Sequence, residues 1–303
     1  MDAITHILTG YSIGNLLAMN SFELTSCIIA SAAMDLDIFI SRVSFKYHRD
    51  FSHSLLSAFI LSISLAAFSL LFNQAFLKIL SLALLSSLSH VLLDLSTTWG
   101  IPLLYPVKKQ SSLELDIAVN PVLLLTSLLL LVVMAISNST SLPILAILLL
   151  IFYLLMRAIL KQIAARKLDG GEIALLPTYS PFIWKVLQRW SSEHGYTQKT
   201  GLLYILQSRY EEINTRAFPY LPVEIGRIAI EPPLENERAA ILYSSSMELV
   251  KSFTSKFKYK NARAKLENGM WRVIWTSSEI GLQIELLISR EGELVKLSSN
   301  WQR

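Results

Sequence analysis

The chain has 303 residues, of which 52% are hydrophobic and only 17% are charged, and its mean hydropathy is +0.46. Because soluble domains carry about 25% charged residues, this composition excludes a wholly soluble protein. The net charge of +4 without a basic tract excludes a nucleic-acid partner, and the single cysteine, Cys27, excludes an internal disulfide and a thiolate metal cage. Charged residues number 17 in residues 1–166 and 33 in residues 167–303, which predicts a membrane domain followed by a soluble one.

Apolar segments in residues 1–166 predict an all-α polytopic bundle of about six helices, arranged as three hairpins. A crossing takes about 20 apolar residues. The run from Ile117 to Met156 contains no charged residue or histidine, so it is long enough for two crossings with a polar break near Asn138. The first two segments are short, so our interpretation leaves two alternatives for the first hairpin, a full crossing and a re-entrant one. The predicted helical segments are residues 3–20, 24–40, 54–77 and 78–95, and the two halves of 117–156.

Lysine and arginine predict the orientation of this bundle. With six crossings, Lys78 is the only basic residue on one side of the membrane. Since positive charge marks the cytoplasmic side, we expect a multi-pass protein with both termini in the cytoplasm. The basic residues assigned to that side are Arg42, Lys46, Arg49, Lys108, Lys109, Lys161, Arg166 and Lys167.

Histidines and aspartates of the membrane domain all fall at this same predicted face. His90 and Asp94 have the spacing i, i+4, so both side chains lie on one helix face and can bind one cation. Imidazole and carboxylate without thiolate suit Zn²⁺ or Mn²⁺. We therefore predict one or two divalent ions. The predicted ligands are His6, Asp35, Asp37, His53, His90 and Asp94, and His48 and Asp116 lie at the same face.

Each residue also has a plainer interpretation. His6 can be a polar interfacial residue, Asp35 or Asp37 can cap the next segment, and Asp116 can be a solvated loop charge. Ionisable residues within a membrane usually mark function, however, and their gathering at one face favours a metal site over coincidence.

The order of these motifs resembles a known family, the predicted membrane-bound metal-dependent hydrolases of bacteria and archaea, over about residues 1–185. The resemblance implies a prokaryotic inner-membrane enzyme. Met34, Asp50 and Ser52 replace a proline, a glycine and a threonine of the family pattern, but the presumed ligands are unchanged. The matching motifs are Met1-Asp2-Ala3-Ile4-Thr5-His6 with Gly10, Asp35-Leu36-Asp37, His48-Arg49-Asp50-Phe51-Ser52-His53-Ser54, His90-Val91-Leu92-Leu93-Asp94, Thr98-Trp99-Gly100 and Tyr105-Pro106.

These features predict hydrolysis of a phosphoester or lipid-linked substrate by metal-activated water at the cytoplasmic face. A looser similarity to zinc-dependent phospholipase C also suggests a phosphate ester. We assign acid–base roles to Asp37 and His48, and anion binding to Arg49. The alternatives are a metal-binding protein or transporter without hydrolase activity, or a membrane anchor for the C-terminal domain. A transporter places its ligands near the middle of the membrane, whereas these residues lie at helix ends.

Residues 167–303 predict a small cytoplasmic α+β domain with an antiparallel sheet of three to five strands, without a catalytic constellation and with protein partners left open. Asn268-Gly269 is a strong hairpin signal. The predicted helices are Pro181–Trp190, Gly201–Arg216 and Met247–Phe257, and the predicted strands are Val223–Ile230, Arg238–Tyr243, Ala262–Glu267, Trp271–Thr276, Gly281–Ile288 and Glu293–Ser299.

Overall fold

The computed structural model describes most of the chain and divides it into two compact units. The helical unit comprises Met1–Ile163 and Pro177–Ile183, and the sheet unit comprises Ala164–Leu176 and Trp184–Arg303. The described residues are 1–37, 51–107, 110–137, 139, 141–192, 195–220, 230–256, 260–277 and 282–301.

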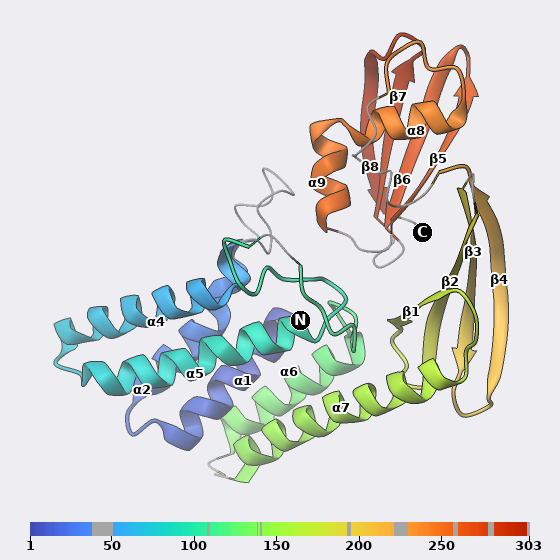
Figure 1. The fold of residues 1–303 in the computed structure, drawn as a ribbon. Coiled ribbons are helices and arrows are strands. Elements are labelled where there is room, and N and C mark those ends of the chain that lie inside the picture. Colours follow the sequence, from blue (N-terminus) through green and yellow to red (C-terminus); the bar gives the residue numbers. More distant parts are fainter. Residues whose placement is uncertain are drawn as a thin grey trace. The chain divides into compact units, whose positions relative to one another are not determined.

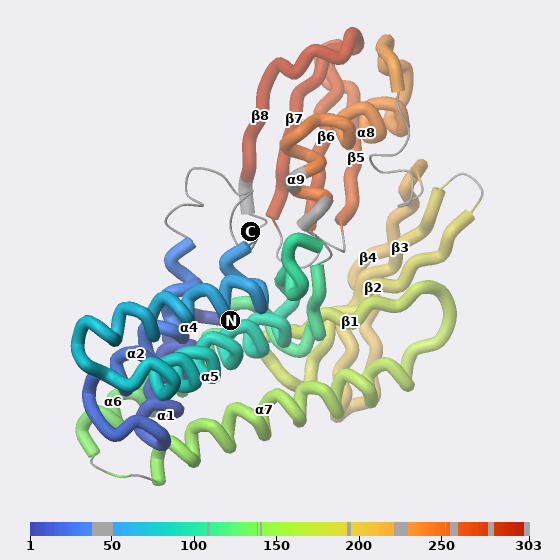
Figure 2. Tube along the Cα trace, turned by 60° about the vertical axis from the view of Figure 1, so that its left-hand side comes forward, coloured from blue at the N-terminus to red at the C-terminus, as the bar shows by residue number. Residues whose placement is uncertain are grey.

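The helical unit is built from α-helices linked by 3-10 turns and loops, and its helices pack side by side (Figures 1 and 2). The helix α7 begins in this unit and continues into the sheet unit. The α-helices are α1 (Ala3–Leu17), α2 (Ser21–Ala32), α4 (Leu55–Ser69), α5 (Phe76–Leu95), α6 (Pro121–Ile136) and α7 (Ser141–Arg166), and the 3-10 helices are η1 (Ala33–Leu36), η2 (Phe51–His53) and η3 (Leu70–Phe72).

The helix count corrects the sequence-based expectation. The described residues contain eight α-helices instead of about six, because two more lie in the sheet unit. Among the described residues, three helices are long and apolar enough to cross a membrane: Leu55–Phe72, Phe76–Leu95 and Ser141–Arg166. The segments 3–20 and 24–40 do not reach that length, since Asn20 caps a new helix and the α-helix gives way to a 3-10 turn at Ala33.

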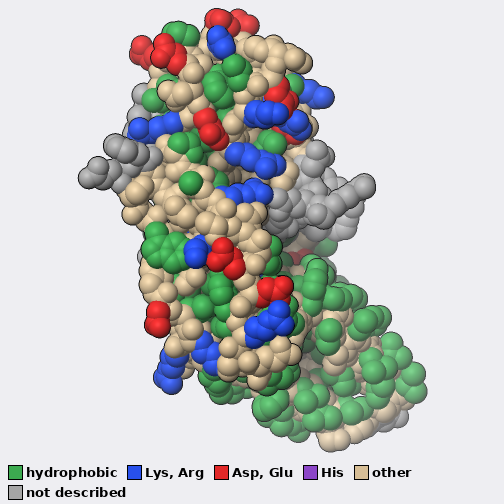
Figure 3. Space-filling model, turned by 90° about the vertical axis from the view of Figure 1, so that its right-hand side faces the viewer, with side chains coloured by type: hydrophobic (Ala, Val, Ile, Leu, Met, Phe, Trp, Pro, Cys, Tyr) green, Lys and Arg blue, Asp and Glu red, His purple; other side chains and the backbone are tan. Residues whose placement is uncertain are grey.

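The apolar helices keep much of their hydrophobic surface on the outside. On α6 and α7, Leu129 is 64% exposed and Phe152 is 66% exposed. Figure 3 shows hydrophobic side chains covering the helical unit, while acidic and basic side chains are spread over the sheets. An exposed apolar surface of this extent is typical of a protein that sits in lipid.

Local capping signals determine where the helices begin. The side chain of Asp2 accepts a hydrogen bond from Thr5 N at 2.9 Å, and Asn20 and Asn120 cap α2 and α6 in the same way. Ser54 forms a capping box at the start of α4. These caps place His6 in the first turn of α1 and His53 immediately before α4.

Small residues bring α1 and α2 close together. A Cβ atom at Gly10 would lie 2.6 Å from Ser31 Cβ and 2.8 Å from the Cys27 carbonyl oxygen. At Gly14 it would lie 2.5 Å from Leu24 Cδ1. This Gly-x-x-x-Gly spacing lets the two helix backbones approach each other, as it does in many membrane proteins. Cys27 is buried in this contact.

An ion pair marks the end of the bundle opposite to the predicted site. Lys78 Nζ lies 2.8 Å from Glu23 Oε2, so the turn before α2 and the turn before α5 meet. The chain turns at Asn73, which has a left-handed conformation (φ 55°) and ends η3. His6, Asp35, His53 and Asp94 therefore belong to the other end of their helices.

The sheet unit contains two four-stranded antiparallel sheets rather than the single sheet of three to five strands that we expected (Figure 1). Helix α8 joins the second sheet, where Trp275 Nε1 donates to Ser244 Oγ at 2.9 Å. The strands of the first sheet are β1 (Glu172–Pro177), β2 (Ile183–Ser192), β3 (Gly195–Tyr204) and β4 (Arg209–Phe218); those of the second are β5 (Lys260–Glu267), β6 (Met270–Ser277), β7 (Leu282–Ser289) and β8 (Leu294–Trp301); the helices are α8 (Glu237–Ser245) and α9 (Glu248–Lys256).

Three of the predicted elements in this unit are wrong. The helices predicted over Pro181–Trp190 and Gly201–Arg216 are strands, because the apolar residues that suggested helical spacing lie on two strands that meet at a turn. Ser208 in that turn has φ 51°. A bulge at Thr200/Gly201 shifts the alternation of side chains between the two faces of the sheet. The strand predicted at Arg238–Tyr243 is α8, which Asn236 caps.

The remaining elements of the sheet unit agree with the sequence. The hairpin at Asn268-Gly269 is confirmed, with φ of 50° and 78° at the two turn residues. Strands β7 and β8 and helix α9 lie where we expected them. The predicted strand Val223–Ile230 falls mostly outside the described residues.

Candidate metal centre

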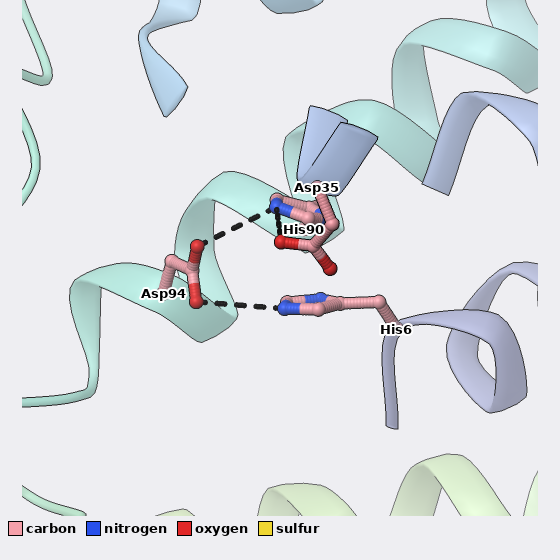
Figure 4. A group of neighbouring side chains, drawn as sticks. All are labelled: His6, Asp35, His90 and Asp94. Carbon is pink, nitrogen blue, oxygen red and sulfur yellow. Dashed lines mark ion pairs between the residues drawn. The ribbon is translucent and has the colours of Figure 1, made fainter. Parts of the chain in front are cut away.

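Four ionisable side chains from three different elements meet at one point. His6 comes from α1, Asp35 from η1, and His90 and Asp94 from α5; one ligand atom of each lies within 4.8 Å of the others (Figure 4). His53 from η2 adjoins them, with Nε2 3.1 Å from Asp94 Oδ2 and 3.4 Å from Asp35 Oδ1. We call these five residues the His/Asp cluster.

The cluster is closed on most sides. The side chains of His6, His53, His90 and Asp94 are fully buried, whereas Asp35 is 20% exposed. Burying a carboxylate costs several kcal/mol unless a positive charge compensates it. The Asp94 carboxylate lies 3.4 Å from Nε2 of both His6 and His90, and the α-amino group of Met1 also contacts it. Asp35 therefore marks the open side of the cluster.

A backbone carbonyl determines the protonation of His90. Its Nδ1 lies 2.6 Å from the carbonyl oxygen of Ser31, which can only accept, so Nδ1 carries the proton. In the neutral ring Nε2 then presents a lone pair. It points between Asp94 Oδ2 at 3.4 Å and Asp35 Oδ1 at 3.8 Å, and it has no hydrogen-bond partner among the described residues. A lone pair facing two carboxylates is the arrangement that a bound cation satisfies.

A serine and an aspartate orient His53 in a similar way. Ser52 Oγ donates to Asp37 Oδ2 at 2.5 Å and lies 2.9 Å from His53 Nδ1. Because the hydroxyl has a single proton and gives it to Asp37, His53 Nδ1 is the donor to Ser52. His53 Nε2 is consequently the nitrogen that faces Asp35 and Asp94. Asp37 lies behind His53, with Oδ2 3.5 Å from Nδ1.

Ser31 connects the helices that carry the cluster. Its carbonyl oxygen accepts from His90, and its hydroxyl donates to the His6 carbonyl oxygen at 2.5 Å. The rings of His6 and His90 are stacked, with centroids 3.7 Å apart and planes at 20°. One residue of α2 thus holds α1 and α5 in register with each other.

Neighbouring imidazoles influence the ionisation of Asp35. Burial by itself raises the pKa of this carboxyl, but its contacts with His53, His90 and the α-amino group of Met1 outweigh that effect, so the pKa lies below its usual value. Asp35 is a carboxylate at neutral pH.

The structure brings together five of the residues singled out from the sequence and separates others. His6, Asp35, His53, His90 and Asp94 form the cluster, and Asp37 lies one layer behind it. His48 and Arg49 lie outside the described residues. The carboxylate of Asp116 belongs to a second buried network.

Arg157 is the centre of that second network, and sequence reasoning missed it. Its Nη2 lies 3.3 Å from Asp116 Oδ1 and 3.2 Å from the Thr178 carbonyl oxygen, and its Nη1 donates to the Ser180 carbonyl oxygen at 3.0 Å. Burial raises the pKa of Asp116, against the lowering effect of Arg157. A single arginine within a long apolar helix was the available signal, because such residues seldom lack a buried partner.

The residues of the cluster fit a divalent cation. Three imidazoles and two carboxylates are ligands that Zn²⁺ and Mn²⁺ accept, and no thiolate is needed. The buried atoms His90 Nε2 and Asp35 Oδ2 lack hydrogen-bond partners among the described residues, as unfilled ligand positions do.

Comparison with protein families gives a match that covers the region carrying the cluster. A family model described as YdjM inner membrane protein matches residues 1–164. Neither the curated proteins nor the solved structures yield a match. The matched residues make up more than half of the 303-residue chain and include every member of the cluster as well as Arg157. The chain therefore belongs to the YdjM inner membrane protein family.

Proposed function

We propose that this protein is a membrane-embedded hydrolase that depends on a divalent metal ion held by the His/Asp cluster. The observation that carries the proposal is the meeting of three imidazoles and two carboxylates in a buried site, with His90 Nε2 directed between the carboxylates of Asp35 and Asp94. An ion pair that only stabilises a fold involves two residues, whereas this cluster gathers five residues from four separate elements.

A bound divalent ion supplies two contributions to hydrolysis: it lowers the pKa of a water molecule from about 15.7 to about 7, and it stabilises negative charge on a phosphoryl oxygen. Ser31 holds a proton on His90 Nδ1, and Ser52 with Asp37 holds one on His53 Nδ1, so both rings keep Nε2 for the ion. Asp35 is the partly exposed member of the cluster, and we therefore expect water and substrate to approach from its side.

His48 and Arg49 immediately precede η2 and His53 in sequence. We assign His48 to proton transfer, together with Asp37, and Arg49 to a phosphate or a developing anion through paired hydrogen bonds. These roles follow from residue type and sequence position.

The position of the cluster favours surface chemistry over transport. His6 lies at the start of α1, His53 before α4, and Asp94 in the last turn of α5. A site at helix ends suits a phosphoester that lies at the level of the lipid headgroups, whereas a transporter binds its ion near the middle of the membrane. The lysines and arginines that the sequence assigns to this side favour the cytoplasmic face and a lipid or lipid-linked substrate.

Metal analysis of the purified full-length protein tests the first part of the proposal. We expect one or two divalent ions per chain, Zn²⁺ or Mn²⁺, and loss of the ion in His90→Ala and Asp94→Asn. His194→Ala is the matched control, because His194 is the one histidine outside the matched family region, and it should keep the ion. A wild-type protein free of metal after supply of both ions would refute the site.

Phosphate release from a substrate panel tests the second part. The panel contains phosphatidic acid, a polyprenyl diphosphate and a soluble aryl phosphate. We expect the protein to release phosphate from a lipid substrate. A chelator should abolish this activity, and Zn²⁺ or Mn²⁺ should restore it. Bound metal without turnover of any of the three would instead identify a metal-binding membrane protein without hydrolase activity.

A further inference from the structure

The sheet unit contains a cavity of about 220 Å³ that the proposed hydrolase site does not use. A water molecule occupies about 30 Å³ of liquid, so the cavity has room for a small organic molecule. Its polar lining comes from both sheets: Lys185 on β2, Gln198 on β3 and Arg216 on β4 in the first, and Asn261 and Arg263 on β5 in the second.

Strand register explains why these side chains converge. Gln198 and Arg216 are direct partners in the β3–β4 pair, so they lie on one face of the first sheet. Asn261 and Arg263 are two residues apart on β5 and therefore share a face of the second sheet. The cavity is the space where these two faces meet.

Hydrogen bonds orient the amide groups of the lining. Arg189 Nε donates to Gln198 Oε1 at 2.8 Å, and Tyr196 OH donates to Asn261 Oδ1 at 2.7 Å. Arg189 Nη2 also donates to Asn261 Oδ1 at 3.3 Å. Because the amide oxygens are engaged in this way, each amide directs its nitrogen, a hydrogen-bond donor, to its other side.

The charge of the lining has one sign. Lys185, Arg216 and Arg263 are positive, and the described residues that line the cavity include no aspartate or glutamate. The nearest acid along β4, Glu212, instead accepts from Thr215 and pairs with Lys199, which are register partners of each other. Burial lowers the pKa of Lys185, since its ammonium group loses hydration, and an anion in the cavity would raise that pKa again.

We propose that this cavity binds a small phosphorylated molecule. The phosphate contacts Lys185, Arg216 and Arg263 and accepts from the Gln198 amide, and the carbon part lies against Phe218 and Ile274, which complete the lining. Three cations suit the double negative charge of a phosphate monoester better than a single carboxylate. The phosphate can belong to a soluble metabolite or to a lipid headgroup.

Calorimetric titration of the full-length protein in detergent tests this proposal. The protein is first treated with a chelator, so that metal-bound phosphate at the His/Asp cluster does not contribute. We expect glycerol 3-phosphate to bind more tightly than inorganic phosphate, and both to bind more weakly as salt concentration rises. Absence of binding by both probes, or tighter binding of succinate than of glycerol 3-phosphate, would overturn the proposal.

Exposed arginines provide matched variants that leave the fold intact. Arg216→Ala and Arg263→Ala should each weaken glycerol 3-phosphate binding about tenfold, the usual effect of losing a charge-assisted hydrogen bond. Arg209→Ala on β4 and Lys265→Ala on β5 are the controls, because both are exposed basic residues outside the lining. Equal weakening by variants and controls would refute the cavity as the site.

Lipid nanodiscs distinguish the two sources of phosphate. If the ligand is a lipid headgroup, phosphatidic acid in the disc competes with glycerol 3-phosphate, and the apparent affinity falls relative to phosphatidylcholine discs. If the ligand is a soluble phosphate ester, the two kinds of disc give the same affinity. His90→Ala should leave the binding unchanged in either case, which separates this site from the proposed hydrolase site.

Discussion

At the scale of single residues, hydrogen bonds behind the cluster decide which nitrogen of each imidazole is available. Spacing along the sequence indicated the ligand types, because His90 and Asp94 share a helix face. The sequence could not show that the Ser31 carbonyl holds His90 Nδ1, or that Ser52 links Asp37 to His53. These contacts join residues far apart in the chain or in separate elements.

Asp37→Asn separates a positioning role from a ligand role. If Asp37 orients His53 through Ser52, the variant should weaken metal affinity by about 10–100-fold without abolishing binding. Chelator competition measures this affinity, with Asp169→Asn as a control outside the helical unit. A complete loss equal to that of Asp94→Asn would show that Asp37 is itself a ligand.

At the scale of elements, the close approach of α1 and α2 brings His6 to Asp35 and Asp94. We expect Gly10→Ala to displace α1 and to lower metal content strongly, because the new Cβ would meet the Cys27 carbonyl oxygen, which cannot move aside. Gly14→Ala should have a milder effect, since its first contact is the flexible end of Leu24. Metal analysis of the two variants makes the comparison, and equal metal content would contradict this account of the packing.

The Arg157 network ties α7 to the loop before α6 and to the segment 177–183. Arg157→Met leaves the buried Asp116 carboxylate without its cation, which should destabilise the protein by about 3–5 kcal/mol. Thermal unfolding in detergent measures the effect, and Arg166→Met, at an exposed position of the same helix, should change the Tm little. Adding Asp116→Asn to Arg157→Met should restore part of the loss; no recovery would argue against a charge effect.

At the scale of the whole molecule, the topology depends on α6. With its 16 residues, α6 extends about 24 Å, which is short of the roughly 30 Å apolar layer. Asn120 at the start of α6 donates to Tyr153 OH on α7, so α6 and the first half of α7 cover the same depth. We therefore expect α6 to cross with local thinning of the bilayer.

Reporter fusions before α4 and after Arg166 test this expectation. Crossings by α4, α5, α6 and α7 put both termini on one side, which the basic loops predict to be the cytoplasm. A fusion after Arg166 that reports the opposite side from one before α4 would mean that α6 does not cross. A reporter that places the N-terminus and the region around Asp94 on opposite sides would contradict the cluster itself.

The membrane nature of residues 1–166 and the residue types of the cluster were predictable, because apolar length and ligand spacing are local properties of a chain. The sheets were harder to predict. Leu202, Leu203 and Ile205 imitate a helical period, but a bulge and a turn place them along a strand and at its end. Only long-range pairing separates these two interpretations.

The amino-acid sequence by itself thus determined that histidines and aspartates lie at one end of apolar helices. The tertiary structure decided which of them are in contact. A glycine-mediated helix contact brings His6 to Asp94, 88 positions away, whereas Asp116 pairs with Arg157 instead. The physical reason is that a side chain's type and helical phase are encoded locally, whereas its partner depends on how closely neighbouring backbones can pack.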